Sequence, residues 1–166
     1  MCLIVTADTR AKKAKRDMRV YKLIKIFVYK DPNDFVYKPW SSGAYPERGI
    51  VTYEIGKQIT QRLSWNYFSR SNVRSNIFVF DSIAHNKYIQ GNTEELKAYK
   101  QGFHSAVSIK RLKGGMLYLY NNTEIILECI IPKGSEYVKD DTGLVISNNI
   151  KPIKSIKLTR TEVLAL

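Results

Sequence analysis

Apolar and polar positions alternate over much of the chain, a pattern that predicts β-strands more often than helices. CLIVT at 2–6 predicts a short first strand. The triplet VYK then occurs three times between residues 20 and 38, and we interpret this stretch as a hairpin with strands at 19–30 and 35–38. The turn between them is Asp-Pro-Asn-Asp at 31–34. Apolar residues occur on both faces of the first strand, which predicts a central position in a sheet.

Further alternating or short apolar runs predict the remaining strands. IVTYEI, IFVF and FHSAVSI each fit one strand, MLYLY and EIILECII fit an antiparallel hairpin, and the stretch 132–150 fits two more strands separated by turns. Loops are predicted where Pro, Gly, Ser and Asn gather, at 39–49 and 69–76. The named strand segments are 50–55, 77–80, 103–109, 116–120 and 124–131.

Two stretches carry helical signals. The clearest helix is 92–102, where Asn92 can cap the first turn, acidic residues follow it, and Gly102 ends it. Ile55, Ile59 and Leu63 lie four residues apart and indicate a short second helix. We therefore predict a single domain, 1–166, with an α+β fold of about eight mostly antiparallel strands and two or three short helices.

The balance of charge points to a partner, since 27 Lys and Arg residues against 15 Asp and Glu give a net charge of +12. This favours an anionic partner, nucleic acid first and an acidic protein surface second. Residues 7–17 form a basic loop or arm, or one or two turns of helix capped by Thr6 or Asp8; a merely solvated loop is the non-functional interpretation. The residues expected to bind nucleic acid are Arg10, Lys12, Lys13, Lys15, Arg16 and Arg19, and then Lys151, Lys154, Lys157 and Arg160.

The sequence lacks the residue patterns that several classes of function require. Cys2 and Cys129 are far apart and have no metal-ligand spacing, so we expect reduced thiols and no metal. The longest apolar stretch, 125–132, is too short to span a membrane, so no membrane partner is expected. The adjacent carboxylates at 94–95 and 140–141 fit a catalytic pair poorly. The common phosphate-binding, zinc and nucleophile motifs do not occur.

Three short motifs and the MCL start resemble a family of small uncharacterised proteins of phages and gut Bacteroidota. The motifs are GFHS at 102–105, IIPKGSEY at 130–137 and ISNNI at 146–150. The resemblance covers most of the chain in order. It implies a phage-encoded protein that acts in the cytoplasm of a bacterial host or is carried in a virion, and it implies no particular chemistry.

The same order of motifs resembles, more remotely, the ADP-ribosyltransferase fold, which would imply NAD as the cofactor and host factors as acceptors. That resemblance assigns Tyr21-Lys22 to the first-strand motif, Phe103-His104-Ser105 to the second and Leu144–Ser147 to the third. Lys22 stands where the family has an arginine or histidine, and the third segment lacks the family's glutamate. Because that carboxylate stabilises the oxocarbenium-like centre, the resemblance implies a degenerate enzyme whose catalytic candidates are Lys22, His104 and Ser105.

The same residues also have purely structural interpretations. His104 would lie on the polar face of a strand, hydrogen-bonded to a neighbour, and Ser105 would lie beside Phe103, where its hydroxyl needs a backbone partner. We expect the aromatic residues near basic ones to pack in the core, with stacking on single-stranded bases as the alternative. They are Trp40, Tyr45, Trp65, Tyr67 and Phe68, near Lys38, Arg48, Arg62 and Arg70.

Taken together, the charge and the motifs favour a phage-associated basic accessory protein that binds an anionic partner. We expect this protein to have no enzymatic activity and no cofactor. Two alternatives remain open. One is a virion structural or cargo protein close to the genome, and the other is the degenerate ADP-ribosyltransferase-like enzyme.

Overall fold

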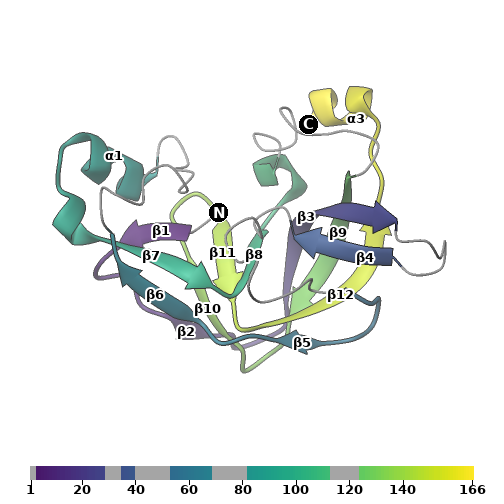
Figure 1. The fold of residues 1–166 in the computed structure, drawn as a ribbon, viewed down its shortest axis with the longest axis horizontal. Helices are drawn as coiled ribbons and strands as arrows, with labels where there is room; N and C mark the ends of the chain where they lie inside the picture. Colours follow the sequence, from purple (N-terminus) through teal and green to yellow (C-terminus); the bar gives the residue numbers. More distant parts are fainter. Residues whose placement is uncertain (1–2, 29–34, 40–52, 69–81, 113–123) are drawn as a thin grey trace.

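The computed structural model describes residues 3–28, 35–39, 53–68, 82–112 and 124–166. Strands in these ranges form two antiparallel sheets, which confirms the predicted α+β fold with mostly antiparallel strands (Figure 1). The larger sheet contains, in spatial order, β2 (Lys12–Lys13), β10 (Glu136–Lys139), β11 (Leu144–Ser147), β8 (Phe103–Ala106), β3 (Met18–Val28), β9 (Glu124–Ile131), β12 (Asn149–Ile156) and β5 (Ile59–Thr60), with β4 (Phe35–Pro39) paired to β3. The smaller sheet contains β1 (Leu3–Thr6), β7 (Leu96–Gln101) and β6 (Ser64–Tyr67). The helices include α1 (Ile83–Ile89), the 3-10 helix η4 (Thr93–Glu95) and α3 (Arg160–Ala165).

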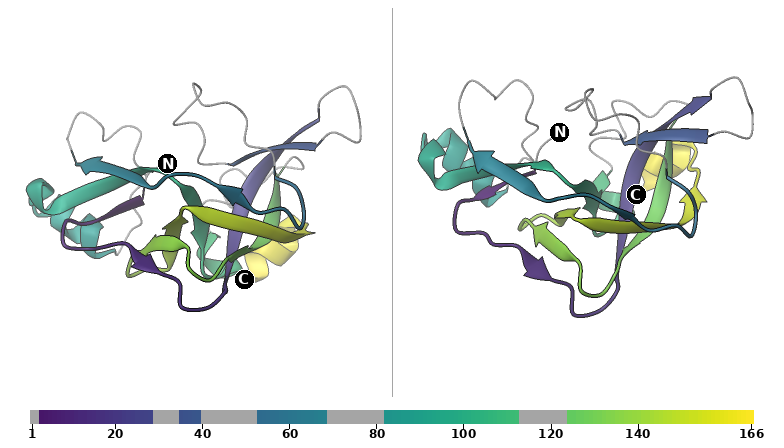
Figure 2. Two further views of the ribbon diagram at one scale, coloured as in Figure 1. Left: turned by 90° about the horizontal axis from the view of Figure 1, so that it is seen from below. Right: turned by 60° about the horizontal axis from the view of Figure 1, so that its bottom comes forward.

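The two sheets pack against each other through an apolar cluster between their facing sides. Leu3, Val5 and Tyr99 from the smaller sheet contact Val138 and Ile146 from the larger one, and all five are buried. The smaller sheet and α1 lie at one end of the molecule, whereas β3, β4, β9 and α3 lie at the other (Figure 1, Figure 2). The packing therefore brings β1 close to β8 and leaves β3, β9 and β12 at the opposite end.

The other side of the larger sheet carries the largest apolar cluster. Val20 and Ile24 from β3 pack with Leu127 and Ile131 from β9, and Phe103 from β8 joins them. Burying each of these side chains contributes about 1.5–3 kcal/mol to folding. Apolar residues on both faces of β3 were the reason to predict a central strand, and β3 indeed lies between β8 and β9.

Several predicted strands are confirmed. The hairpin of 19–30 with 35–38 corresponds to β3 and β4, which pair from Ile24↔Pro39 to Val28↔Phe35. The strand at 2–6 corresponds to β1, and the two strands within 132–150 are β10 and β11. The strand at 103–109 is shorter than predicted, because β8 ends at Ala106.

The predicted helix 92–102 is wrong, because most of this stretch is strand β7 in the middle of the smaller sheet. The Asn92 side chain makes no capping hydrogen bond, and only a single 3-10 turn, η4, precedes the strand. Leu96, Ala98 and Tyr99 are all buried, and β1 and β6 pair with the two edges of the strand. Burial on both faces outweighs the local capping signals.

The helix predicted from Ile55, Ile59 and Leu63 is also wrong, because its residues form a turn, strand β5 and the approach to β6. The strand predicted at 50–55 is wrong over its described part, since Tyr53 and Glu54 have no regular structure. Conversely, the sequence pattern missed α1. The Ser82 Oγ caps this helix by accepting a hydrogen bond from the His85 N–H.

The basic segment 7–17 is not helical, so that alternative is wrong. Lys12 and Lys13 pair with β10, and the buried Ala14 exchanges backbone hydrogen bonds with the turn that precedes β10. Strand β9 pairs with β3 on one edge and, over Ile126–Ile130, with β12 on the other, whereas MLYLY, its partner in the predicted hairpin, lies outside the described residues. The predicted turn at 31–34, the loops at 40–49 and 69–76, and the strands at 77–80 and 116–120 lie outside the described residues.

Candidate functional site

Three basic side chains from the two predicted sets gather on one face of the larger sheet. Arg19 of β3 and Lys151 of β12 both lie opposite Ile130 of β9, one on each side, and Lys154 lies opposite Glu128 of the same strand. Residues directly opposite each other on neighbouring strands project from the same face and have Cβ atoms about 5 Å apart. We call Arg19, Lys151, Lys154 and Glu128 the basic cluster.

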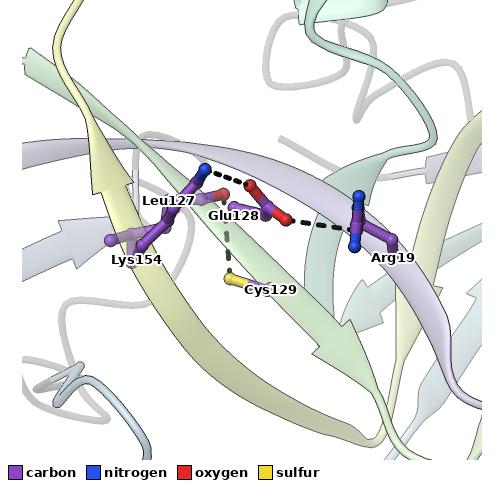
Figure 3. A network of polar contacts seen from close by, with 5 residues as sticks. All are labelled: Arg19, Leu127, Glu128, Cys129 and Lys154. Atoms are coloured by element: carbon purple, nitrogen blue, oxygen red, sulfur yellow. Dashed lines mark hydrogen bonds and ion pairs between the residues drawn. The ribbon is translucent and has the colours of Figure 1, made fainter.

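Glu128 holds two of these cations with one carboxylate (Figure 3). Arg19 Nε lies 3.1 Å from Glu128 Oε1, and Lys154 Nζ lies 3.4 Å from Glu128 Oε2. The glutamate is buried, whereas the Arg19 and Lys154 side chains are 69% and 63% exposed. Three positive charges therefore accompany one negative charge, and the bridging cations remain open to solvent.

A β-bulge in β12 decides that Lys151 and Lys154 share a face. Pro152 lies opposite Cys129 and Lys154 lies opposite Glu128, so that two residues of β12 oppose one residue of β9. Residues three apart on a regular strand point to opposite faces. Without the bulge, Lys154 would lie on the opposite face of the sheet, with the apolar cluster that contains Leu127.

The other predicted basic residues are distributed over different elements, and those whose side chains are described are exposed. Lys12 and Lys13 lie in β2, which five strands separate from β12 in the sheet, and Lys13 is opposite Glu136. Lys157 follows the end of β12, and Arg160 is the first residue of α3. The exposed side chains are those of Arg10, Lys12, Lys13, Lys15, Arg16 and Lys157.

Lys22, the first catalytic candidate, is buried where β8 separates from β3. The two strands pair at Tyr21↔Ala106, and beyond this point Lys22 Nζ donates a 2.6 Å hydrogen bond to the carbonyl oxygen of His104. The ammonium also lies 5.8 Å from the centre of the Tyr53 ring. Burial lowers the pKa of Lys22 to about 8. These contacts give the side chain a structural role, since it satisfies a backbone carbonyl at the split in the sheet.

The His104 side chain faces β1. Its Nε2 accepts a 3.2 Å hydrogen bond from the Leu3 N–H, which confirms the predicted hydrogen bond to a neighbour. Burial, and then the Lys22 ammonium, lower the pKa of His104 to about 3. The ring is therefore neutral at pH 7, with its proton on Nδ1. Among the described residues, the buried Ser105 Oγ has no hydrogen-bond partner, so the predicted backbone partner is not found there.

The three segments assigned by the transferase resemblance lie on adjacent strands, in the order β11, β8, β3. Lys22 and Ser105 project from one face, as the Tyr21↔Ala106 pair requires, but His104 projects from the other. The third segment, Leu144–Ser147, forms β11 and contains no carboxylate. The three catalytic candidates therefore do not project from one common face of the sheet.

The aromatic residues divide between the core and the surface. Phe68 is buried in a cluster with Leu96 and Ala98, which confirms core packing for this residue. Trp65 and Tyr67 are exposed, so core packing is wrong for these two. Trp40 and Tyr45 lie outside the described residues.

Glu128 and Lys97 were not among the candidate site residues predicted from the sequence. Glu128 interrupts an otherwise apolar strand, EIILECII, and a lone charge at such a position signals a partner on the same face. Lys97, whose Nζ lies 4.8 Å from the centre of the Trp65 ring, falls within the stretch 92–102 that was predicted to be a helix. Reading LKAYK as an alternating strand would have placed Lys97 and Tyr99 on one face.

Comparison of the chain with protein-family models, with curated proteins and with solved structures found no match. The two family resemblances drawn from short motifs therefore stay predictions. In the part of the chain that the structure describes, no helix is long and apolar enough to cross a membrane. Within the same ranges, no group of three or more His, Cys, Asp or Glu side chains could hold a metal ion.

Proposed function

We propose that this protein binds nucleic acid through the basic cluster on β3, β9 and β12, and that it acts as a phage-associated accessory protein without catalysis of its own. The observation that carries this proposal is the pairing of Arg19 and Lys154 over the buried Glu128, with Lys151 beside them. Cations held at fixed spacing on a sheet suit the evenly spaced phosphates of a nucleic-acid backbone.

The ion pairs leave the cations able to bind. Arg19 reaches Glu128 through Nε, and a guanidinium has further N–H donors that can contact a phosphate. The Lys154 side chain is likewise 63% exposed. Because Glu128 already restricts both long side chains, binding would cost less side-chain entropy than it would for free lysines and arginines.

The rest of the positive charge supports binding at longer range. The net charge of +12 raises the local concentration of any polyanion around the protein. Contacts to phosphates carry no sequence information, so the proposed binding is independent of base sequence. A protein packed beside a phage genome would use the same contacts, which makes the virion a second setting for this function.

The test neutralises the cluster while keeping side-chain size. The triple variant Arg19→Gln, Glu128→Gln, Lys154→Gln removes two positive charges and one negative charge, so the net charge falls by one. Lys57→Gln is the matched control, because it also lowers the net charge by one at a cation paired with a surface carboxylate, Glu54. We expect the triple variant to bind a 20-nucleotide DNA about tenfold more weakly at low salt, and the control to bind like the natural protein.

Equal affinities of the two variants would contradict the proposal, because the charge would then act only through its total. Thermal unfolding of each variant shows whether the fold is retained. The Gln replacements avoid leaving Glu128 as an unpaired buried charge, which would itself destabilise the protein.

A further inference from the structure

Exposed aromatic rings and a cation lie together on one face of the smaller sheet, at the other end of the molecule from the basic cluster (Figure 1). Trp65 of β6 lies opposite Tyr99 of β7, and Tyr67 lies opposite Lys97, so all four side chains project from the same face. Nζ of Lys97 lies 4.8 Å from the centre of the Trp65 ring and 5.6 Å from that of Tyr99.

Exposure rises steadily across this face. Leu3 and Val5 of β1 and Tyr99 of β7 are buried in the contact between the two sheets. Lys97 is only 5% exposed, because its side chain lies against the rings of Trp65 and Tyr99. Trp65 and Tyr67 are 41% and 71% exposed. The face therefore ends in two rings that project from a packed base into solvent.

The two rings have a fixed mutual geometry. Trp65 and Tyr67 pack edge to face, with ring centres 5.2 Å apart and an angle of 89° between the ring planes. The cation–π contact of Lys97 restrains Trp65, and Trp65 packs against one side of Tyr67, which is still 71% exposed. The exposed Tyr67 ring is left as a flat, restrained surface with an ammonium group close by.

From this arrangement we propose that Trp65, Tyr67 and Lys97 form a stacking platform for an unpaired base of a single-stranded nucleic acid. Aromatic rings next to positive charge are the recurring recognition device for single strands, because every base has a π-face and every nucleotide has a phosphate. Arg10 lies close enough to Lys97 to add positive charge at this end of the sheet, while Asp8 offsets part of it. A base within a duplex is stacked on both faces and cannot use the platform.

The inference rests on the proposed function in one respect, since both require nucleic acid as the partner. It adds that the strand is single and that a base, not only a phosphate, is bound. A free nucleotide has the same base chemistry and a protein partner could also cover exposed rings, so the test must separate these sources from a strand.

The experiment compares two DNA strands of equal length and charge, oligothymidylate and a strand of abasic sites, with a duplex and with thymidine monophosphate. The chain has two tryptophans, so Trp40→Phe leaves Trp65 as the only tryptophan reporter. We expect oligothymidylate to quench the Trp65 fluorescence and the abasic strand and the duplex to leave it unchanged. In this background Tyr67→Ala should weaken binding of oligothymidylate about 5- to 150-fold and leave binding of the abasic strand unchanged.

Ile89→Ala on α1 is the matched control, because it truncates another exposed apolar side chain and should change neither affinity. Equal affinity for both strands, or no effect of Tyr67→Ala, would overturn the platform while leaving the proposed function intact. If thymidine monophosphate quenches Trp65 at the same concentration as oligothymidylate does, the platform for a strand is overturned, and the site binds a free nucleotide instead. If the natural protein binds no strand at low salt, the proposed function fails first, and a protein partner for these rings becomes the explanation.

Discussion

One carboxylate organises the cations of the basic cluster. Glu128 is buried, yet both of its oxygens point at exposed basic side chains, Arg19 and Lys154. Pairs with such exposed partners contribute only about 0–1 kcal/mol to folding, because water screens them and ordering the long side chains costs entropy. The role of Glu128 should therefore be visible in binding more than in stability.

Replacing this carboxylate gives a direct prediction. Glu128→Gln raises the net charge by one and frees both cations to contact a phosphate, and we expect this electrostatic gain to exceed the entropy cost of losing the restraint, so that the affinity for DNA rises about fivefold, or roughly 1 kcal/mol. Fluorescence anisotropy with a labelled oligonucleotide measures the change. Glu136→Gln is the control, because it adds the same charge opposite Lys13 at the far side of the sheet. A similar gain in the control would show that only total charge matters.

A second residue, His104, makes the stability of the fold depend on pH. Its pKa is about 3 in the folded protein, against an ordinary value of 6.5, because the ring is buried and the Lys22 ammonium lies near it. Between these pH values the unfolded chain binds a proton that the folded chain does not bind. The free energy of unfolding should therefore fall as the pH is lowered from 6.5 toward 3.

The slope of this loss can be isolated with His104→Gln, whose side-chain carbonyl can still accept the Leu3 N–H. Over this range we expect the natural protein to lose up to about 1.4 kcal/mol per pH unit more than the variant. Urea unfolding at a series of pH values measures both curves. Parallel curves would mean that His104 is protonated in the folded state and that the described hydrogen bond does not hold it neutral.

At the scale of elements, Gly102 is the point where the chain passes from the smaller sheet to the larger one, between β7 and β8. Its φ of +137° is unfavourable for other residues, and a Cβ atom there would lie 2.7 Å from side-chain carbons of Ile146 and Leu63. The glycine that was predicted to end a helix is thus required for a different reason. It lets two strands of different sheets follow each other without a loop.

Gly102→Ala should destabilise the protein by about 2 kcal/mol or more, since backbone strain and overpacking act together. Gly134→Ala is the matched control, because Gly134 also has a positive φ, +86°, but nothing lies within 4 Å of its added Cβ. The control should cost about 1 kcal/mol, from strain alone. Thermal or urea unfolding compares them, and equal losses would refute the close packing around Gly102.

Local sequence patterns predicted the secondary structure correctly where they favour the same structure as the tertiary packing. They predicted it wrongly where the packing favours a different structure. The hairpin of β3 and β4 is such an agreement, because short-range turn residues and alternation both favour it. The stretch 92–102 is a conflict. Its capping and stop residues favour a helix, but Leu96, Lys97, Ala98 and Tyr99 are buried on both faces by neighbours far away in the sequence. No local pattern contains that information.

The candidate site shows the same limit at the scale of the whole molecule. The charge of the chain predicted basic residues for binding, and all whose side chains are described are exposed. Which of them lie together depends on the register of β3, β9 and β12 and on the bulge before Lys154. Residues 19, 128 and 154 meet only because the sheet places them in adjacent rows, so the cluster could not be derived from spacing along the chain.

The most direct measurement is the affinity of the natural protein and of the Arg19→Gln, Glu128→Gln, Lys154→Gln variant for one DNA strand over a range of salt concentrations. Each phosphate contact contributes about −0.7 to the slope of log affinity against log salt for a single strand. The account predicts a slope of about −2 or steeper for the natural protein and a slope shallower by about 1.4 for the variant. Absence of binding at low salt, or an identical slope for the two proteins, would contradict it.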